Sequence, residues 1–431
     1  MLNKNRLLVL VLVLGLVVTV LPAAAQEDNT LRIGLMVDQS GALTLYGFEL
    51  EYGFRLGLEY ASDGSLTAGG RPVEVLVRDN AGDPDTAVSQ ARELIEQEGV
   101  EILVGAPSSG VTVALQQVAL DYDVILMAAP GASPAITSTN FNVNTFRVCR
   151  NVYQDFLTFA NYAQANLGRN FLQFAADYEF GRGSAEAAEA VYGALGFNFV
   201  APTIYAPLDT TDFTPYIQQI LDLHPDVLLP IWAGDGAITL FQQFTELGVF
   251  DNMAVAMGMN SNDVVAASDP SQIGLIGWIV YHYTFPETAA NDWLTEQYQA
   301  QYNDYPDLFS ECSFATGQAL INALDATNGE TLPEALIPAL EGMIFDGPKG
   351  VYGIRPSDHQ ALAPMYIVQL DNVDSPVFAF FKNLGEVSAL EIAPPCSLPD
   401  EMADRCDMDA DFMTAFTEAV GGDMTTPESG S

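Results

Sequence analysis

Short apolar runs alternate along this chain with stretches in which apolar residues recur at helical spacing. Leu31–Val37 is an apolar run that predicts a strand, and Tyr52, Leu56 and Tyr60 then recur every four residues, as on one face of a helix. Further strands are predicted at Val73–Val77, Ile102–Val104 and Val124–Met127. One helix is predicted to begin at Pro84, and another to span Val111–Tyr122. Strands separated by helices predict a parallel sheet with helices on both faces, a doubly wound α/β arrangement.

A second series of the same kind begins after Phe146–Val148. Its predicted helices are Gln154–Leu167, Gly183–Leu195, Phe213–Leu221 and Ala237–Leu247, and its predicted strands are Phe171–Ala175, Asn198–Thr203, Val227–Ile231, Ala254–Met257 and Trp278–Tyr281. Three further helices are predicted at Trp293–Tyr302, Phe314–Asn328 and Leu332–Leu340, before a hairpin-like end with strands at Gly350–Ile354 and Met365–Gln369. From Leu384 onward, proline and polar residues predict loop and a disordered tail.

The first 25 residues have the pattern of a secretory signal peptide. Lys4 and Arg6 precede an apolar stretch from Leu7 to Leu21, and Ala23-Ala24-Ala25 supplies small residues for cleavage. We predict cleavage before Gln26 and a periplasmic or extracellular location. An uncleaved anchor is the alternative, although the apolar stretch is shorter than the ~20 residues that span a bilayer.

The chain is strongly acidic. It has 15 Lys and Arg against 56 Asp and Glu, a formal net charge of −41 at pH 7. Such a chain repels nucleic acid and anionic lipid, so neither is expected as a partner. The charge is typical of a solvated surface suited to high salt or to low pH, and composition does not choose between these habitats. Capture of cations or of a basic partner is the functional alternative.

Four cysteines in an exported chain indicate disulfides. Cys396 and Cys406 are expected to pair, whereas Cys149 and Cys312 either pair or remain buried thiols. No cysteine cluster has metal-ligand spacing and the three histidines are scattered, so neither a metal nor a cofactor is expected. The sequence also lacks the Gly-x-Ser-x-Gly, His-Glu-x-x-His and P-loop motifs. An enzyme is therefore not expected.

Two loops at predicted strand ends are candidates for binding a small polar ligand. Ser108 and Ser109 precede a helix whose first N–H groups are unpaired, and such helix ends favour anions. The loop Ala129–Pro134 follows a strand, at the sheet edge where doubly wound folds bind ligands. Simple N-capping and a proline-rich turn are the structural alternatives.

The order and spacing of these landmarks resemble the periplasmic substrate-binding proteins of ABC importers, specifically the leucine/isoleucine/valine-binding family. The likeness covers Leu31 to Asn372 and rests on these segments: Leu31–Gly41, Asp79–Pro84, Gly105–Gly110, Ala129–Pro134, Phe345–Gly350 and Arg355–Gln360. The resemblance implies a type I periplasmic-binding-protein fold of two Rossmann-like lobes. Three crossover strands would join them, near Val148–Val152, Ile279–Pro286 and Lys349–Pro356.

The resemblance also implies a domain division and a function. The first lobe would comprise residues 30–149 plus 282–352, the second 150–281 plus 353–383, and a C-terminal extension 384–431. A monomer would capture an amino acid, an amide or a small carboxylate in the interlobe cleft and deliver it to an ABC permease and its ATPase. A ligand-sensing receptor domain with a separate signalling partner is the alternative, and a secreted hydrolase the weakest one.

Family members hold the ligand carboxylate with a serine that matches Ser109, beside Ser108. They hold the amino-acid group with loop positions that match Gly131 and Ser133. Aromatic positions that line the ligand match Tyr46, Phe180, Trp232 and Phe309, with Tyr178 as an alternative to Phe180. For any one of these rings, core packing is the structural alternative.

One position departs from the family pattern. Amino-acid binders place a glutamate where this chain has Asn260, and that glutamate pairs with the ligand ammonium. A buried ammonium without a partner would be strongly unfavourable. Either Asp235, Asp177 or Glu311 supplies the carboxylate, or the ligand has no ammonium group. We therefore expect leucine, isoleucine and valine to bind poorly unless one of these three carboxylates reaches the cleft. The segment Arg355–Gln360 resembles the branch of the family that takes amides, urea or aromatic acids, with a structural hinge element as the alternative.

Overall fold

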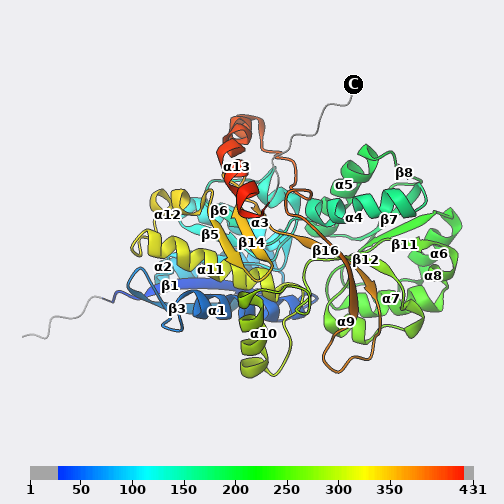
Figure 1. Cartoon of the computed structure of the whole chain (residues 1–431), viewed down its shortest axis with the longest axis horizontal. Helices are drawn as coiled ribbons and strands as arrows, with labels where there is room; N and C mark the ends of the chain where they lie inside the picture. Colours follow the sequence, from blue (N-terminus) through cyan, green and yellow to red (C-terminus); the bar gives the residue numbers. More distant parts are fainter. Residues whose placement is uncertain (1–27, 422–431) are drawn as a thin grey trace, which may run out of the picture. The chain divides into compact units, whose positions relative to one another are not determined.

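The computed structural model describes residues 28–421. The predicted signal peptide, its cleavage site before Gln26 and the final part of the predicted tail lie outside the described residues. The chain divides into the units Met1–Thr30 and Leu31–Ser431. The fold is carried by the second unit, which Figure 1 shows coloured along the sequence.

The first sheet of this unit has six strands in the order β2-β3-β1-β4-β5-β6. Its members are β1 (Leu31–Val37), β2 (Thr67–Ala68), β3 (Arg71–Asp79), β4 (Ile102–Gly105), β5 (Ile125–Ala128) and β6 (Thr145–Arg147). All neighbours pair in parallel except β2, which is antiparallel to β3. The strand predicted from the first apolar run coincides with β1.

Helices cover both faces of the first sheet, because successive strand residues point to opposite sides. Ile33 and Leu35 pack with α1 (Thr44–Ala61) and α11 (Ser310–Ala326). Met36, on the other face, packs with α2 (Pro84–Glu98) and α3 (Ser109–Asp121). The predicted cap of α2 is present, since the Asp83 side chain accepts a hydrogen bond from the backbone N–H of Thr86.

Helices α1 and α11 approach each other closely at glycines. A Cβ atom at Gly57 would lie 2.1 Å from the carbonyl oxygen of Phe314, and one at Gly53 would lie 2.2 Å from that of Ser310. Both positions therefore require glycine. This contact ties α11, which is distant in sequence, to the first sheet.

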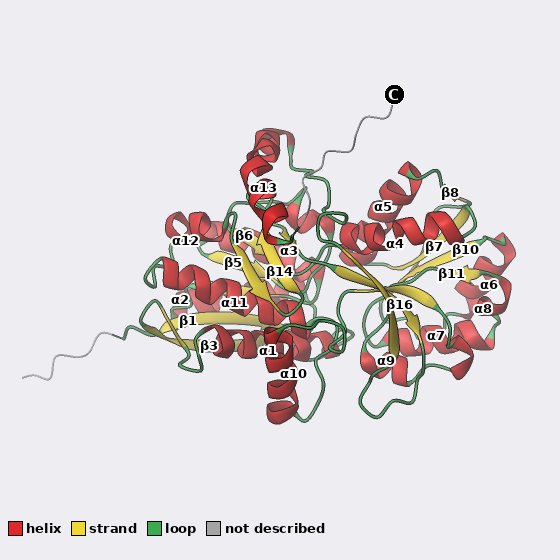
Figure 2. Cartoon of the chain, viewed as in Figure 1, coloured by secondary structure: helices red, strands yellow, loops and turns green. Residues whose placement is uncertain are grey.

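The second large sheet has five strands, with β7 and β10 at its centre. Its parallel strands are β7 (Asn170–Ala176), β8 (Asn198–Phe199), β9 (Ile204–Ala206), β10 (Val227–Ile231) and β11 (Ala254–Val255). The helices of this series are α4 (Val152–Asn166), α5 (Glu179–Ala194), α6 (Thr214–Leu223), α7 (Gly236–Glu246), α8 (Val249–Asn252) and α9 (Asn262–Ala266). Figure 2 shows the helices around the strands of both sheets.

Two small antiparallel sheets complete the unit. One contains β12 (Ile276–Ile279), β16 (Met365–Leu370) and β17 (Phe381–Val387), and the other contains β13 (Ile344–Gly347), β14 (Gly350–Ile354) and β15 (Ala361–Leu362). The predicted hairpin between Gly350–Ile354 and Met365–Gln369 is therefore wrong. β14 pairs instead with its sequence neighbours β13 and β15, whereas β16 pairs with β17 and with the distant β12.

These pairings define two lobes. We call Leu31–Arg147 with Ala289–Leu362 the first lobe; it contains α10 (Ala289–Tyr302), α11 and α12 (Pro333–Leu340), and β13 packs on α10 and α11. We call Val152–Ile279 with Met365–Val387 the second lobe, in which α4 packs on β12 and β16. The chain passes between the lobes at residues 148–151, 280–288 and 363–364. The third passage lies after β15, downstream of the predicted Lys349–Pro356, and the predicted boundary at 352/353 falls inside β14.

The chain beyond β17 is more ordered than predicted. The 3₁₀ helix η4 (Asp400–Asp409) and the helix α13 (Ala410–Ala419) occupy part of the segment expected to be loop and tail. Phe412 and Phe416 recur at helical spacing and are buried together with Leu362. The two rings thus pack α13 against the first lobe.

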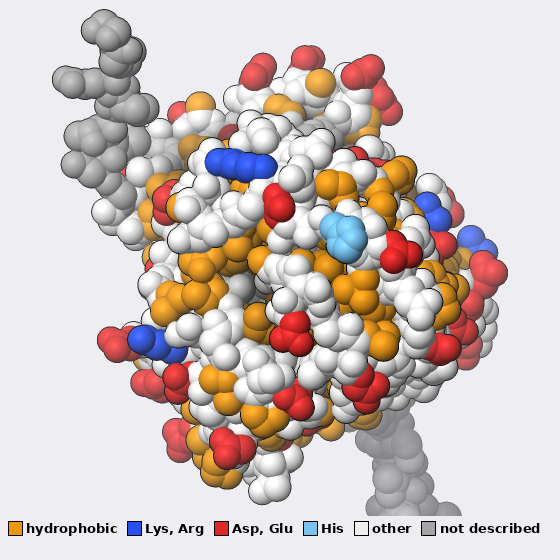
Figure 3. Space-filling view, turned by 90° about the vertical axis from the view of Figure 1, so that its right-hand side faces the viewer, with side chains coloured by type: hydrophobic (Ala, Val, Ile, Leu, Met, Phe, Trp, Pro, Cys, Tyr) orange, Lys and Arg blue, Asp and Glu red, His pale blue; other side chains and the backbone are white. Residues whose placement is uncertain are grey.

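Both disulfides are formed in the described structure. Cys396 pairs with Cys406 as predicted, and Cys149 pairs with Cys312, which settles the alternative left open by the sequence. The second bond links the first interlobe passage to α11 in the first lobe. On the face shown in Figure 3, acidic side chains are spread widely and basic ones are few, in agreement with the composition.

Candidate functional site

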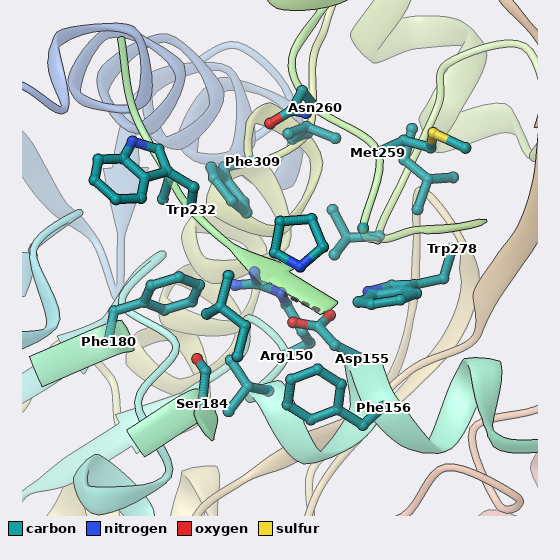
Figure 4. A pocket seen from close by; sticks show the side chains of 18 of the residues that line it. Arg150, Asp155, Phe156, Phe180, Ser184, Trp232, Met259, Asn260, Trp278 and Phe309 are labelled. Carbon is teal, nitrogen blue, oxygen red and sulfur yellow. Dashed lines mark hydrogen bonds and ion pairs between the residues drawn. The ribbon is translucent and has the colours of Figure 1, made fainter. Parts of the chain in front are cut away.

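A cavity lies where the two lobes meet. Its volume is about 90 Å³. Its walls come from α1, α4, α5, the end of β10, the loop before α9, β12 and the start of α11. Residues from both lobes and from the passages between them therefore converge on one space (Figure 4).

Most of the wall is apolar and much of it is aromatic. The rings that line the cavity are those of Tyr46, Phe156, Phe180, Trp232, Trp278 and Phe309. Tyr46 and Phe309 meet edge to face, with ring centroids 4.8 Å apart. Such an edge-to-face contact fixes the orientation of both rings.

Arg150 and Asp155 place one charge of each sign in this apolar wall. The Nε of Arg150 lies 3.3 Å from Oδ1 of Asp155, and the two side chains are 11% and 8% exposed. The guanidinium carbon lies 4.9 Å from the centroid of the Phe309 ring, a cation–π contact. Among the described residues that line the cavity, these two alone carry a formal charge. Figure 4 shows the pair at the centre of the lining.

Burial and neighbouring charges act against each other at Asp155. Burial raises the pKa of this carboxyl, while Arg150 and Lys349 oppose the shift. The sequence interpretation missed both Arg150 and Asp155. The available signal was position, because Arg150 lies in the predicted crossing Val148–Val152, and an arginine in a crossing between lobes stands next to the ligand cleft.

A buried polar group lies behind the cavity wall. Lys349 Nζ donates to the carbonyl of Val280, a lining residue, at 3.1 Å and lies 3.4 Å from Oε2 of Glu311. The Tyr352 hydroxyl donates to Glu311. Burial raises the pKa of Glu311 to about 7, with Lys349 opposing it. Glu311 was a candidate for the ligand ammonium, but it lies outside this lining.

Five of the ten predicted site residues line the cavity: Tyr46, Phe180, Trp232, Asn260 and Phe309. The hydroxyl of Tyr46 in the first lobe accepts a hydrogen bond from the backbone N–H of Gly234 in the second lobe, at 3.1 Å. The structure thus brings together the predicted aromatic positions and Asn260. Tyr178, the alternative to Phe180, lies at a smaller adjoining cavity that shares Tyr46, Arg150, Phe180 and Phe309.

The other five predicted residues, Ser108, Ser109, Gly131, Ser133 and Asp235, lie outside the lining of the main cavity. The hydroxyl of Ser109 accepts hydrogen bonds from the backbone N–H groups of Ala132 and Ser133, both at 3.1 Å. The hydroxyl of Ser133 donates to Glu179 at 2.8 Å. Asp235 is exposed, as is the alternative carboxylate Asp177, which pairs with Arg182. The two loops that carry these serines contribute Pro107, Pro130 and Ala132 to the lining of the adjoining cavity.

Asp38, at the end of β1, is buried beside these loops. One of its carboxylate oxygens accepts the backbone N–H of Ser108 at 2.8 Å. Burial raises the pKa of this carboxyl from 3.8 to about 7, against hydrogen bonds from Ser108, Asn80 and Gly82 and with a smaller contribution from Asp79. The folded state therefore holds the proton more tightly than the unfolded state between these two pH values.

Consequently, the Asp38 carboxyl should make the protein less stable as the pH rises through this window. Replacing Asp38 by Asn should reduce the loss of unfolding free energy between pH 5 and pH 8 by at least about 1 kcal/mol, since one pKa unit corresponds to about 1.4 kcal/mol. Urea denaturation at both pH values measures this. Asp63→Asn, at an exposed position, is the matched control. Identical pH dependence in wild type and Asp38→Asn would contradict the prediction.

The sequence model of the periplasmic binding protein family matches residues 30–375. The chain belongs to this family. It is similar to an ABC-type branched-chain amino acid transporter protein of Rhodopseudomonas palustris, with 30% identity, coverage of 86% of this chain and 100% of that one, and a TM-score of 0.71. It is also similar to Leu/Ile/Val-binding protein homolog 6 of Brucella suis, with 23% identity over 371 residues, 84% of this chain and 92% of the relative.

A third similarity shows the fold alone. A solute-binding protein of R. palustris, solved in complex with benzoate, is 21% identical, covers 83% of this chain and 96% of that one, and has a TM-score of 0.74. The predicted type I fold and family are confirmed. This periplasmic binding protein is thus an extracytoplasmic solute-binding component of an ABC transporter, a class that binds solutes for a membrane permease. Within residues 28–421, none of the helices has the length and apolar character needed to cross a membrane.

Proposed function

We propose that this periplasmic binding protein captures a small monocarboxylate with an aromatic or branched apolar body. The observation that carries the proposal is a single guanidinium, Arg150, in a cavity otherwise walled mainly by aromatic and aliphatic side chains. A planar guanidinium binds a carboxylate through two parallel hydrogen bonds. The surrounding rings would cover the apolar part of the ligand.

The charges around the cavity support an anionic ligand. Arg150 and Lys349 are cations, whereas burial raises the pKa of both Asp155 and Glu311. Since the pKa of Glu311 is about 7, this group is partly protonated at neutral pH. An added monoanion would find its countercharge in Arg150, in competition with Asp155. A cation would meet Arg150 with no unpaired carboxylate to offset it.

Ligand binding would hold the two lobes together. Several hydrogen bonds join them near the cavity, including those from Gly234 N–H to Tyr46, from Asp235 N–H to the carbonyl of Ala42 at 2.9 Å, and from Asn262 N–H to Asp307 at 2.7 Å. We propose that these bonds form on closure, as in other hinge-closing binding proteins. The protein would act as a monomer, cleaved before Gln26, and would release its ligand unchanged to the permease.

A matched pair of neutral and anionic probes tests the proposal. Benzoate is a small aromatic carboxylate, and benzamide has nearly the same shape without the charge. Isothermal titration calorimetry should show benzoate binding at least about tenfold more tightly than benzamide, a difference of about 1.4 kcal/mol. Small-angle scattering should show a monomer, and mass spectrometry should recover the probe unaltered. Equal affinity for the two probes would contradict the carboxylate assignment.

A further inference from the structure

The chain makes a fourth connection between the lobes after the three passages described above. Strand β17 pairs with β16 in the second lobe, but α13 packs on the first lobe. We call the intervening chain with α13 the C-terminal arm (Ser388–Gly421). The family model ends at residue 375, so the arm lies outside the part of the chain that it matches.

The arm docks on the first lobe through apolar packing. The aromatic rings of Phe412 and Phe416 stack with centroids 5.5 Å apart and cover β14 and β15. Gly353 leaves room for them, because a Cβ atom there would lie 2.5 Å from a ring carbon of Phe416. Figure 1 shows α13 in red next to β14.

The arm also binds the segment Arg355–Gln360 through polar contacts. Arg405 donates to the carbonyls of Ser357 at 2.9 Å and Pro356 at 2.6 Å, and it lies 2.7 Å from Oε1 of Glu341. Asp409 accepts hydrogen bonds from the backbone N–H and the hydroxyl of Ser357, at 2.9 and 2.6 Å. The Cys396–Cys406 disulfide closes the arm into a loop next to these contacts.

The segment Arg355–Gln360 is itself hydrogen-bonded to the first passage, which carries Arg150. The side-chain amide of Gln360 donates to the carbonyl of Cys149 at 2.8 Å and accepts from Nε of Arg147 at 2.7 Å. The ring of His359 stacks on Phe146, with centroids 3.8 Å apart. From the other side, Arg355 donates to the carbonyl of Pro394 in the arm at 2.7 Å. The first passage, the approach to the third passage and the arm thus form one hydrogen-bonded unit.

We infer that the C-terminal arm is a hinge brace that restricts how far the lobes open and keeps the ligand-free protein near its closed arrangement. Opening rotates the lobes about their connecting segments. The arm is a fourth connection. Because it is bound to the segment Arg355–Gln360, which approaches the third passage and is hydrogen-bonded to the first, it resists this rotation. Restricting the open state would also increase the binding-competent fraction and so tighten apparent affinity.

Interlobe distances in the ligand-free protein test the brace. Spin labels at Leu66→Cys in the first lobe and Leu247→Cys in the second use two exposed positions. Electron–electron double resonance then compares wild type with Arg405→Gln and with Arg405→Gln combined with Cys396→Ser and Cys406→Ser. We expect progressively broader distributions, shifted by several ångströms to longer distances. Arg169→Gln, at an exposed position in the second lobe away from the arm, should leave the distribution unchanged.

A purely structural role of the arm would give a different result. If the arm only stabilises the first lobe, urea stability should fall while the interlobe distribution remains that of wild type, and this outcome would overturn the inference. If the combined variant does not fold, Asp409→Asn removes the charged contact to Ser357 and provides the same comparison. Since no ligand is used, the result is independent of the proposed carboxylate specificity.

Discussion

Replacing Arg150 by Met is expected to weaken benzoate binding by about 100-fold or more, which corresponds to about 2.7 kcal/mol or more. The guanidinium is the one cation among the described lining residues, and the aromatic wall offers a carboxylate no comparable partner. Met retains an unbranched apolar side chain, so the cavity should keep its shape. Calorimetry with benzoate and with benzamide measures the change, and benzamide binding should change much less.

Two control variants make this result specific. Arg169 stacks on Phe197 with its guanidinium carbon 4.6 Å from the ring centroid, much as Arg150 stacks on Phe309. Arg169→Met removes the same kind of contact at an exposed site and should leave affinity unchanged. Arg150→Lys keeps the charge but loses the planar fork, so an intermediate affinity is expected. Undiminished benzoate binding in a folded Arg150→Met protein would show that the carboxylate binds elsewhere, with the loops around Ser109 and Ser133 as the next candidates.

Elements that form from local pattern were predicted well. The runs Leu31–Val37 and Val227–Ile231 are continuous apolar stretches and coincide with β1 and β10. The pairing of the antiparallel strands was not predicted well. The short strands β13 and β15, which flank Gly350–Ile354 and pair with it, were not recognised, and Met365–Gln369 pairs with β12, far away in the sequence. The helix α13 was missed because Phe412 and Phe416 are almost the only large buried side chains in an acidic segment.

The candidate site shows the same division. The family resemblance led to Tyr46, Phe180, Trp232, Asn260 and Phe309, all of which line the cavity. It assigned no role to Arg150 or Asp155, although the predicted crossing Val148–Val152 contains Arg150. It also pointed to Ser109 and Ser133, whose hydroxyls are engaged with protein groups in this structure. Matching residues to family positions thus identified the apolar wall of the cavity better than its charged side chains.

Asn260 replaces the glutamate that pairs with the ligand ammonium in amino-acid binders, which left open whether another carboxylate takes its place. Asp155 is a carboxylate that does line the cavity. Asp155 is not among the candidates named from the sequence, which were Asp235, Asp177 and Glu311. Its Oδ1 already lies 3.3 Å from Nε of Arg150. For a simple carboxylate ligand, Asp155 competes for the guanidinium. For a zwitterionic amino acid, it would replace the missing glutamate as the partner of the ammonium group. The two ligand classes therefore predict opposite effects of removing its charge.

Replacing Asp155 by Asn should tighten benzoate binding several-fold, because Arg150 loses its competing anion while the amide oxygen can still accept a hydrogen bond. Leucine should bind weakly to both proteins, since the neutral Asn260 cannot pair with its ammonium. Asp177→Asn, which removes an exposed carboxylate paired with Arg182, is the matched control and should change neither affinity. Calorimetry with both probes on the three proteins decides the matter. Micromolar leucine binding that is lost in Asp155→Asn would assign Asp155 to the ammonium, and the natural ligand would then be an amino acid. The unpaired Arg150 of that variant would still be free to hold the amino acid's carboxylate, so the loss would report the ammonium contact alone.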